Sequence, residues 1–520
     1  MRSYLQLAPP INKQCLMIFL ALLLGSTAVL AHAEPSVPYM PTWQARHYLE
    51  RLVDEAGLKI TTTHWPLPAS AVQNALDDLP SDLSPSLAES KAFVSAELRK
   101  LYQHGNVDAQ LRNRAEAPVG FGENYTPGSS VKLSSAATQF GPDGLPIAAR
   151  VGLRVEQNPD SLQTNFSGGL GSNSRTQARL DDTALVAEIS GFNVQAFAHQ
   201  NWWGPGWQSS LINSNNIPPW MGVGIQRSEV KPSESKWLSW MGAWSFEGFM
   251  AQAQDPTMVA NQPNTYFMGS RLTLKPWSWA EIGFTRDEQM TGTAHQMLST
   301  TFAVGNTQGA QQDVNGTSNG VAGYDVKLSC PKGMHCATYF QWMGEDASGQ
   351  SHLPNQFMTL GGAEWWSDSG RHRLFTEFMQ TYTHSLPWND YHYVGIGYRN
   401  GSYPQGFTNG GRWIGSSFGG DARVLTVGWL DAEASRTLKL YSGETSTALG
   451  SYNPDTNATG NLIGPHGRLL GFGVQQSFQW NAWAITPEFS YIHLADGQSV
   501  GINRTTDIRA GVTLSRALGD

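Results

Sequence analysis

Apolar and polar residues alternate one by one along several stretches of this chain, most clearly in LGFGVQQSFQW from Leu470 to Trp480. Successive side chains of a strand point to opposite faces, so a period of two predicts strand and not helix. The same alternation recurs in six further stretches, at 150–155, 270–275, 280–285, 324–329, 485–491 and 508–515. We therefore expect β-strands with one apolar and one polar face to dominate the chain.

The length of the strand-rich region separates two architectures that share this alternation. A soluble β-sandwich also alternates, but a sheet of this size normally splits into domains with helical cover. About 400 residues of strand and turn pattern follow position 120 without helical periodicity, enough for roughly 16 to 18 strands of a membrane barrel. We therefore predict an all-β transmembrane barrel of antiparallel strands over residues 120–520.

The composition agrees with a barrel. The chain has 54 glycines, 19 tryptophans and a mean hydropathy of −0.33, so it is polar on average yet rich in aromatic residues. Membrane barrels alternate lipid-facing and water-facing residues and carry aromatic girdles at both interfaces. The net charge of −8 argues against a nucleic-acid partner.

Residues 1–33 are predicted to be a secretory signal. Arg2 and Lys13 precede an apolar run at 16–30, and small residues follow before Glu34. No apolar run of about 18 residues remains after this segment, so we expect no transmembrane helix in the exported chain.

Two cysteines remain after the signal is removed, because Cys15 lies within it. Disulfides persist in exported proteins, so we predict a bond between Cys330 and Cys336. Barrels keep periplasmic turns short and outer loops long, which places this short connection on the periplasmic side. The connection after Gly344 would then face outward. Long polar segments would form outer loops or an inward plug, at about 286–320, 383–420 and 442–466.

Residues 34–115 are expected to form a small helical bundle. Apolar residues recur at helical spacing at 41–57 and 72–79, and a third helix begins after Ser84, a candidate cap, with Pro85 in its first turn. Because the signal delivers the N-terminus to the periplasm, we place this bundle on the periplasmic side.

The stretch NWWGPGW puts Trp202, Trp203 and Trp207 around a Gly-Pro-Gly sequence that is neither helix nor strand. The three indoles are expected to cluster at the rim or in the lumen of the barrel. Asn215 and Asn216 follow within the same segment.

The run from Trp202 to Trp207, with Leu211, the Ser-Asn-Asn sequence ending at Asn216 and Pro218, resembles the signature of the Wzi capsule-assembly family of outer-membrane proteins. Further segments resemble that family in the same order, beginning at Gly269, Tyr339, Leu374, Tyr391 and Asp421. The resemblance covers roughly residues 40 to 515. It implies an 18-stranded barrel with a periplasmic helical bundle, occluded by loops. It also implies a lectin-like protein of the bacterial outer membrane that organises capsular or other extracellular polysaccharide.

Sugar rings stack their apolar faces on indoles, and their hydroxyls bond to amides and carboxylates. The candidate polysaccharide contacts are therefore Trp202, Trp203, Trp207, Asn215, Asn216, Glu345 and Asp346. Each has a structural alternative. Barrel aromatics commonly serve as girdle or packing residues, and asparagines commonly cap turns.

We do not expect an enzyme, a cofactor or a metal site. Glu345 and Asp346 are adjacent, and neighbouring strand residues point to opposite faces, so they would not flank one glycosidic bond. The 13 histidines show no metal-ligand spacing. Two other functions stay open: a diffusion channel for small polar solutes, and a surface hydrolase with a convergent carboxylate pair.

The expected partners follow from these interpretations. They are capsular or extracellular polysaccharide, outer-membrane lipid and, through the helical bundle, polysaccharide export machinery. The chain is expected to act as a monomer.

Overall fold

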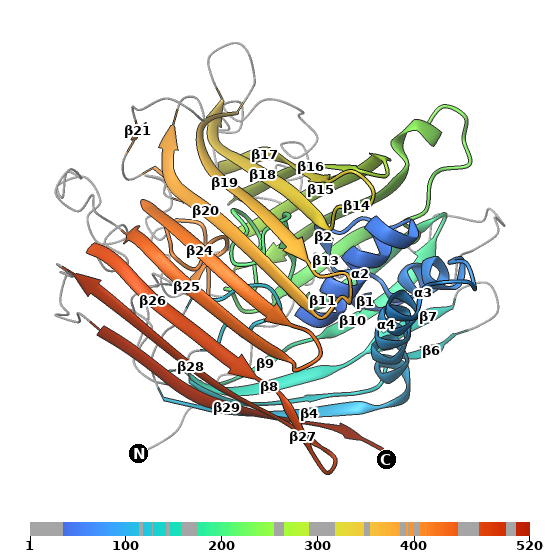
Figure 1. The fold of residues 1–520 in the computed structure, drawn as a ribbon, viewed down its shortest axis with the longest axis horizontal. Helices are drawn as coiled ribbons and strands as arrows, with labels where there is room; N and C mark the ends of the chain where they lie inside the picture. The colour runs from blue at the N-terminus through green and yellow to red at the C-terminus, as the bar shows by residue number, and fades with distance from the viewer. Residues whose placement is uncertain are drawn as a thin grey trace.

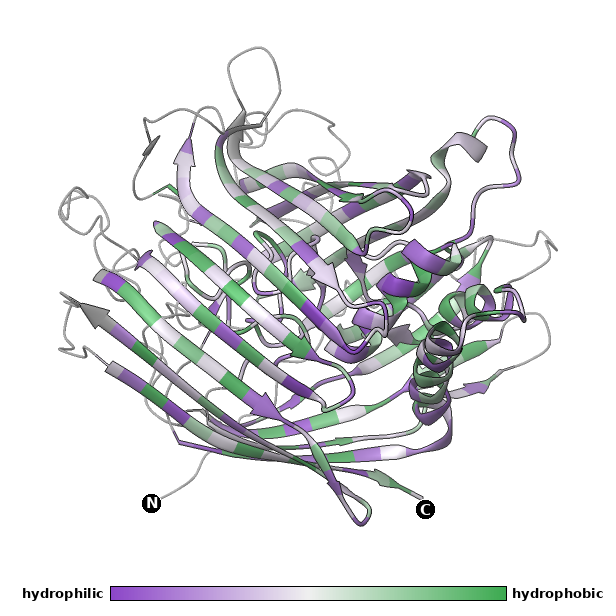
Figure 2. Cartoon of the chain, viewed as in Figure 1, coloured by the Kyte–Doolittle hydropathy of each residue, from purple (hydrophilic) through white to green (hydrophobic). Residues whose placement is uncertain are grey.

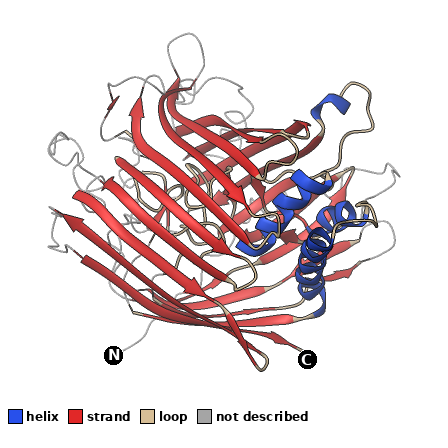
Figure 3. Ribbon diagram, viewed as in Figure 1, coloured by secondary structure: helices blue, strands red, loops and turns tan. Residues whose placement is uncertain are grey.

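Long antiparallel strands wind around the molecule, and three helices pack at one end of them (Figure 1, Figure 3). The computed structural model describes residues 35–113, 118–126, 128–141, 146–158, 175–253, 265–290, 318–347, 354–384, 392–393, 396–398, 406–410, 412–445, 467–495 and 506–519. The predicted signal segment, 1–33, lies outside these residues, as do most of the predicted long segments at 286–320 and 442–466.

One large antiparallel sheet holds most of the strands. Its first half contains β4 (Gly105–Arg112), β5 (Ser129–Ser134), β6 (Thr138–Phe140), β7 (Ile147–Arg150), β8 (Gly152–Asn158), β9 (Arg175–Leu180), β10 (Thr183–Ile189), β11 (Phe192–His199), β13 (Trp220–Arg227), β14 (Ala243–Gln252), β15 (Tyr266–Trp277) and β16 (Ala280–Met290). Its second half contains β17 (Ser318–Ser329), β18 (Cys336–Ala347), β19 (Pro354–Trp366), β20 (His372–His384), β21 (His392–Tyr393), β24 (Ala422–Asp431), β25 (Arg436–Thr445), β26 (Gly467–Gln476), β27 (Phe478–Trp480), β28 (Trp483–Ala495) and β29 (Thr506–Leu518).

Most strands pair with the next strand along the chain, as in a series of hairpins. This holds from β13 through β20, then β20 pairs with β24 and the series continues to β29. The strand β29 also pairs with β4, from Gly511 opposite Arg112 to Leu518 opposite Gly105. The sheet therefore joins segments about 400 positions apart in the sequence.

The two faces of the sheet have reversed polarity compared with a soluble protein. Leu153 and Leu470 are 45% and 63% exposed, whereas Arg154 is only 6% exposed. Figure 2 shows apolar and polar bands alternating along the strands. The predicted alternation is confirmed, and its apolar face points outward. Such a surface suits contact with lipid, with a polar interior.

The N-terminal helices are α2 (Trp43–Ala56), α3 (Ala69–Asp77) and α4 (Pro85–Gln103), with the short strands β1 (Pro38–Tyr39), β2 (His64–Trp65) and β3 (Leu67–Pro68) beside them. All three helices were predicted. Gly57 ends α2 in the left-handed conformation, with φ of 74°. Pro85 opens α4, but the Ser84 side chain makes no capping hydrogen bond. Among the described residues, no helix has the length and apolar character needed to cross a membrane.

The boundary between helices and sheet differs from the prediction. The strand β4 begins at Gly105, directly after α4 and inside the range 34–115 that was assigned to the bundle. Its alternation spans only Val107, Ala109 and Leu111 before the pattern stops. An alternating pattern this short does not distinguish a strand from a loop. The assignment of β4 as a strand therefore depends on its pairing with β29.

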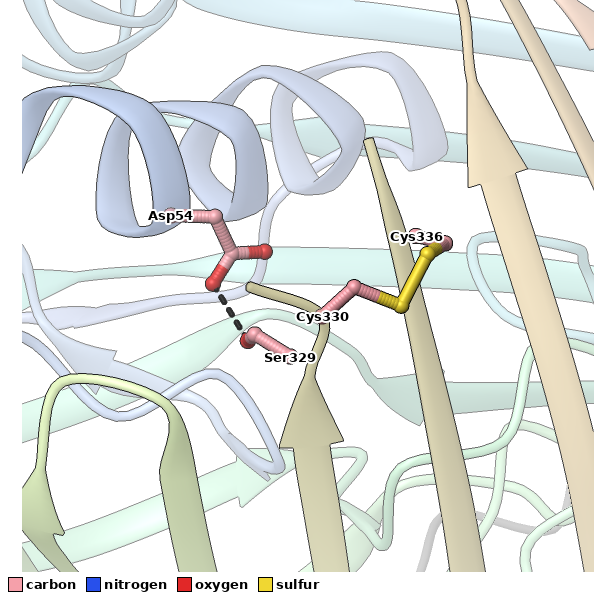
Figure 4. The surroundings of a disulfide bond; sticks show 4 residues. All are labelled: Asp54, Ser329, Cys330 and Cys336. Carbon is pink, nitrogen blue, oxygen red and sulfur yellow. Dashed lines mark hydrogen bonds between the residues drawn. A yellow bond between two sulfur atoms is a disulfide. The ribbon is translucent and has the colours of Figure 1, made fainter. Parts of the chain in front are cut away.

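The turn between β17 and β18 contains the disulfide between Cys330 and Cys336. Beside it, the Ser329 hydroxyl donates a hydrogen bond of 2.6 Å to the Asp54 carboxylate of α2 (Figure 4). Burial raises the pKa of Asp54 against the opposing effect of two nearby lysines. The covalently closed turn therefore lies against the helical end of the molecule.

Candidate functional site

The tryptophan segment, residues 202–217, lies inside the molecule. Trp202 and Trp203 form a two-residue strand, β12, that pairs with His64 and Trp65 of β2. The expectation that this stretch is neither helix nor strand was therefore wrong for its first two tryptophans. Their partner lies more than 130 positions earlier in the sequence, where local periodicity gives no signal.

Residues just before β2, which pairs with the tryptophan segment, are hydrogen-bonded to the large antiparallel sheet, called the wall below. The backbone N–H groups of Thr62 and Thr63 each donate to the Glu281 carboxylate of β16, at 2.8 Å. The backbone N–H of Gly204 donates to the Thr63 carbonyl at 2.9 Å. The N-terminal region thus connects the tryptophan segment to the sheet.

Trp207 occupies a charged pocket of the interior. Its indole N–H donates to Glu364 at 2.6 Å, and its backbone N–H donates to Glu377 at 2.8 Å. The Arg46 guanidinium lies over its ring, 4.2 Å from the centroid. Arg46 also donates to the carbonyls of Pro205 and Gly206. Residues of α2, β19 and β20 therefore hold Trp207 in place.

The glycine at position 206 is required by close contacts. A Cβ added there would lie 2.1 Å from the Ser209 carbonyl oxygen and 2.8 Å from the Glu377 carboxylate. Gly204 has φ of 150°, which other residues adopt only with strain. The sequence GPG thus lets the backbone approach the carboxylates of the wall.

A buried group of charges connects α2 to the wall. Glu50 contacts Arg46 at 2.8 Å and Lys327 at 3.0 Å, and it also pairs with Arg373 of β20. Burial alone would raise the pKa of Glu50, but these three cations outweigh it and hold the pKa below its usual value. The carboxylate is therefore ionised inside the molecule.

Asn216 connects the tryptophan segment to a second part of the interior. The Asn216 side chain donates to the Trp413 carbonyl at 2.9 Å, and Arg412 donates to the Asn216 backbone oxygen at 2.6 Å. Both partners belong to β23 (Arg412–Trp413), which pairs with β22 (Thr408–Asn409). Asn215 instead lies at the edge of a cavity.

This cavity has a volume of about 570 Å³ and lies between the segment and strands β4, β5, β8, β25, β26, β28 and β29. Residues of opposite charge form ion pairs along the lining of the cavity. Lys439 pairs with Glu123, Lys132 with Asp182, Arg154 with Asp181, and Arg112 and Arg509 with Glu488. The Asn215 side-chain oxygen lacks a hydrogen-bond partner within the described part of the chain. The cavity is thus lined by paired charges, and the buried Asn215 lies at its edge.

Sequence reasoning did not single out the charged residues of this cavity. Arg154 and Glu488 were recognised only as members of the polar faces of alternating stretches. The alternation therefore predicted that both side chains point to the polar, inward face of the sheet. Which of them face one cavity depends on strand pairing, which the alternation does not give.

The candidate sugar contacts are distributed unevenly. Trp202, Trp203 and Trp207 are at most 2% exposed, which favours the packing alternative. Direct sugar contact by these three residues stays a prediction. Glu345 and Asp346 belong to the last residues of β18, at the end far from Cys336, and their side chains lie outside what the structure describes. The described residues contain no cluster of three acidic, histidine or cysteine side chains that could hold a metal ion.

Comparisons with known proteins identify the family. A family profile for the capsule assembly protein Wzi matches residues 102–456. An uncharacterized 55.8 kDa protein in the cps region of Klebsiella pneumoniae is 27% identical over 341 residues, which is 62% of this chain and 62% of that protein. This chain thus matches less than two thirds of the relative's length.

The fold has a close solved counterpart. The structure of Wzi, an outer membrane protein involved in group 1 capsule assembly in Escherichia coli and described as a carbohydrate-binding β-barrel, has a TM-score of 0.72 to this chain. The match covers 94% of this chain and 100% of that one at 21% identity, so it bears on the fold. The chain belongs to the Wzi family of capsule assembly proteins.

Proposed function

We propose that this chain is a non-catalytic, lectin-like outer-membrane protein that helps attach or organise capsular or other extracellular polysaccharide at the cell surface. The observation that carries the proposal is the tryptophan segment packed inside the sheet. The stretch that resembles the family signature is locked between α2 and the wall by Glu364, Glu377 and Arg46. A protein that conducts solutes needs an open lumen, whereas a fixed segment inside the sheet narrows this one.

The architecture behind this function is a closed barrel of 18 strands. The large sheet contains 23 strands among the described residues. The pairs β5/β6, β7/β8, β9/β10 and β26/β27 each count as one interrupted strand, and the two-residue β21 is set aside, which leaves 18. Pairing of β29 with β4, of β8 with β9 and of β7 with β10 supports closure. Closure satisfies the backbone groups of every strand within the bilayer.

The helices belong on the periplasmic side in this proposal. The short turns and the disulfide lie at the same end of the sheet as α2, which fits the pattern of short periplasmic turns. A helical bundle at this end is where export machinery would dock. The end of β18 that contains Glu345 and Asp346 would then lie on the extracellular side.

The predicted contact residues divide between two roles. Asn215 lines the cavity but is only 2% exposed, so it would meet a sugar hydroxyl only after the segment shifts. The three tryptophans and Asn216 hold the segment that positions it. Loss of Trp207 would therefore disturb binding through the shape of the segment.

The test compares polysaccharide in washed cells and in the supernatant. A strain lacking the gene is complemented with wild type, with Trp207→Ala or with the control Trp279→Ala, which alters an exposed rim residue. We expect unchanged total polysaccharide, with more in the supernatant for the deletion and for Trp207→Ala only. Unchanged partition in the deletion strain would reject the proposal in favour of a diffusion channel, the second candidate that the charged cavity favours. Solute uptake would then be measured.

A further inference from the structure

A protruding loop, residues 228–242, joins β13 to β14 and is much longer than the neighbouring turn at 278–279. Figure 3 shows a short helical turn standing away from the sheet in this region, η2 (Ser239–Met241). At its tip, Trp237 is 87% exposed, Trp240 63% and Leu238 43%. Three large apolar side chains in contact with water at one loop tip indicate a binding surface.

The base of the loop is firmly held. Val230 is buried in the core, and the Arg227 guanidinium donates to the carbonyls of Glu229, Lys231 and Trp244. The same guanidinium lies 3.9 Å from the centroid of the Trp244 ring. The loop is thus a defined projection from the wall.

The tip is also ordered by its own backbone. The N–H groups of Leu238 and Ser239 donate to the Ser235 carbonyl, and that of Met241 donates to the Leu238 carbonyl. Met241 is buried beneath the tip while its neighbours are exposed. The exposed indoles are therefore presented in a preformed arrangement.

The lipid-facing surface of the sheet continues into this loop. Gly242 forms a bridge with Lys275 at the end of β15. Trp277 ends β15 and Trp279 lies in the adjacent turn; both are about half exposed, with their rings stacked at 5.4 Å. Four exposed tryptophans thus gather on one sector of the rim at the helical end.

We propose that the protruding loop anchors the barrel to the periplasmic leaflet of the outer membrane, inserting Trp237, Leu238 and Trp240 at the boundary between phospholipid headgroups and acyl chains. Tryptophan favours this boundary because its ring is apolar and its N–H is polar. The exposed Lys236, on the same loop, is available to headgroup phosphates, whereas Lys231 pairs with Glu229 at 3.2 Å. The inference rests on the proposal that the sheet spans the outer membrane.

The occupant is lipid and not a protein because of this continuity. The outward apolar face of β13, with Ile225 40% exposed, leads directly to the base of the loop. A protein partner would have to displace lipid along the same edge.

Site-directed labelling tests the proposal in liposomes. With Cys15→Ser, and with Cys330 and Cys336 oxidised, Trp237→Cys is labelled with an environment-sensitive dye. The protein is reconstituted with phospholipids that carry a nitroxide near the headgroup or deep in the acyl chain. Phe284→Cys, on the outward face of β16, is the positive control. Glu433→Cys, on the exposed turn between β24 and β25, is the negative control.

We expect the dye at position 237 to be quenched more strongly by the shallow nitroxide than by the deep one, with the reverse order at 284 and no quenching at 433. A dye at 237 that stays unquenched while 284 is quenched overturns the anchor. Absence of quenching at both positions instead rejects the membrane-spanning sheet. Trp240→Cys repeats the measurement if Trp237→Cys does not fold, as judged by heat-dependent gel migration.

Discussion

Arg373 donates a hydrogen bond from Nε to Nδ1 of His47, 2.8 Å away, although 326 positions separate them in the sequence. Because Nδ1 accepts, the ring proton lies on Nε2, which donates to the Gly370 carbonyl at 2.7 Å. Burial and the charge of Arg373 lower the pKa of His47 well below its usual value. A neutral imidazole therefore docks α2 on β20.

This docking should weaken in acid. A base whose pKa is lowered by folding contributes stability above its unfolded pKa of about 6.5, and loses it as pH falls below that value. The free energy of opening α2 should fall with a slope approaching about 1.4 kcal/mol per pH unit below pH 6. Hydrogen exchange of the α2 amides between pH 8 and pH 5, corrected for intrinsic exchange rates, measures it. His47→Gln should remove this part of the slope; an unchanged slope would assign it to another group.

Removal of the Glu50 charge should release α2 from the wall. Glu50→Gln leaves Arg46, Lys327 and Arg373 with one carboxylate fewer in a buried site, and breaking such a pair costs about 3 to 5 kcal/mol. Hydrogen exchange of α2 should report this loss. The control Glu89→Gln lies on the exposed face of α4 and should change stability by less than about 0.5 kcal/mol. Equal effects of both variants would contradict the role assigned to Glu50.

A methyl group at position 206 should open the interior. Gly206→Ala places a Cβ against the Ser209 carbonyl and the Glu377 carboxylate, so the tryptophan segment must move. We expect higher single-channel conductance in planar bilayers than for wild type. Gly248→Ala, where the nearest atom is 3.6 Å away, should behave as wild type. If Gly206→Ala folds and conducts like wild type, another part of the chain closes the lumen.

Loss of the disulfide should loosen one end of α2. The double variant Cys330→Ser, Cys336→Ser frees the turn that positions Ser329 against Asp54, and closing a loop this short is worth about 2 kcal/mol. Exchange at the C-terminal end of α2 should rise to the level seen in reduced wild type. Reductant should have no further effect on the double variant; a further rise would point to a different reducible group.

The sequence alone predicted the elements whose signals are local. The alternation at 508–515 falls inside β29, and Pro85 marks the start of α4. The Cys330–Cys336 bond followed from a count of two cysteines in an exported chain. Each of these signals lies within a few consecutive residues.

The contacts of the interior could not be predicted from the sequence, for a physical reason. The apolar stripe of α2 was recognised, but Arg46, His47 and Glu50 are buried as well, because the helix packs against charged side chains of the sheet. Rules that place charged residues at the surface fail in a protein with reversed polarity. The pairing of Trp202 with Trp65 likewise depends on two strands of two residues each.

The pairing of β29 with β4 has a consequence for biogenesis. Without β29, both β4 and β28 would present unpaired N–H and C=O groups to hydrocarbon, where each unsatisfied group costs several kcal/mol. Insertion strand by strand into bare lipid is therefore unfavourable at every stage before completion. Pairing of β29 with β28 and β4 therefore satisfies both open edges of the sheet in one step.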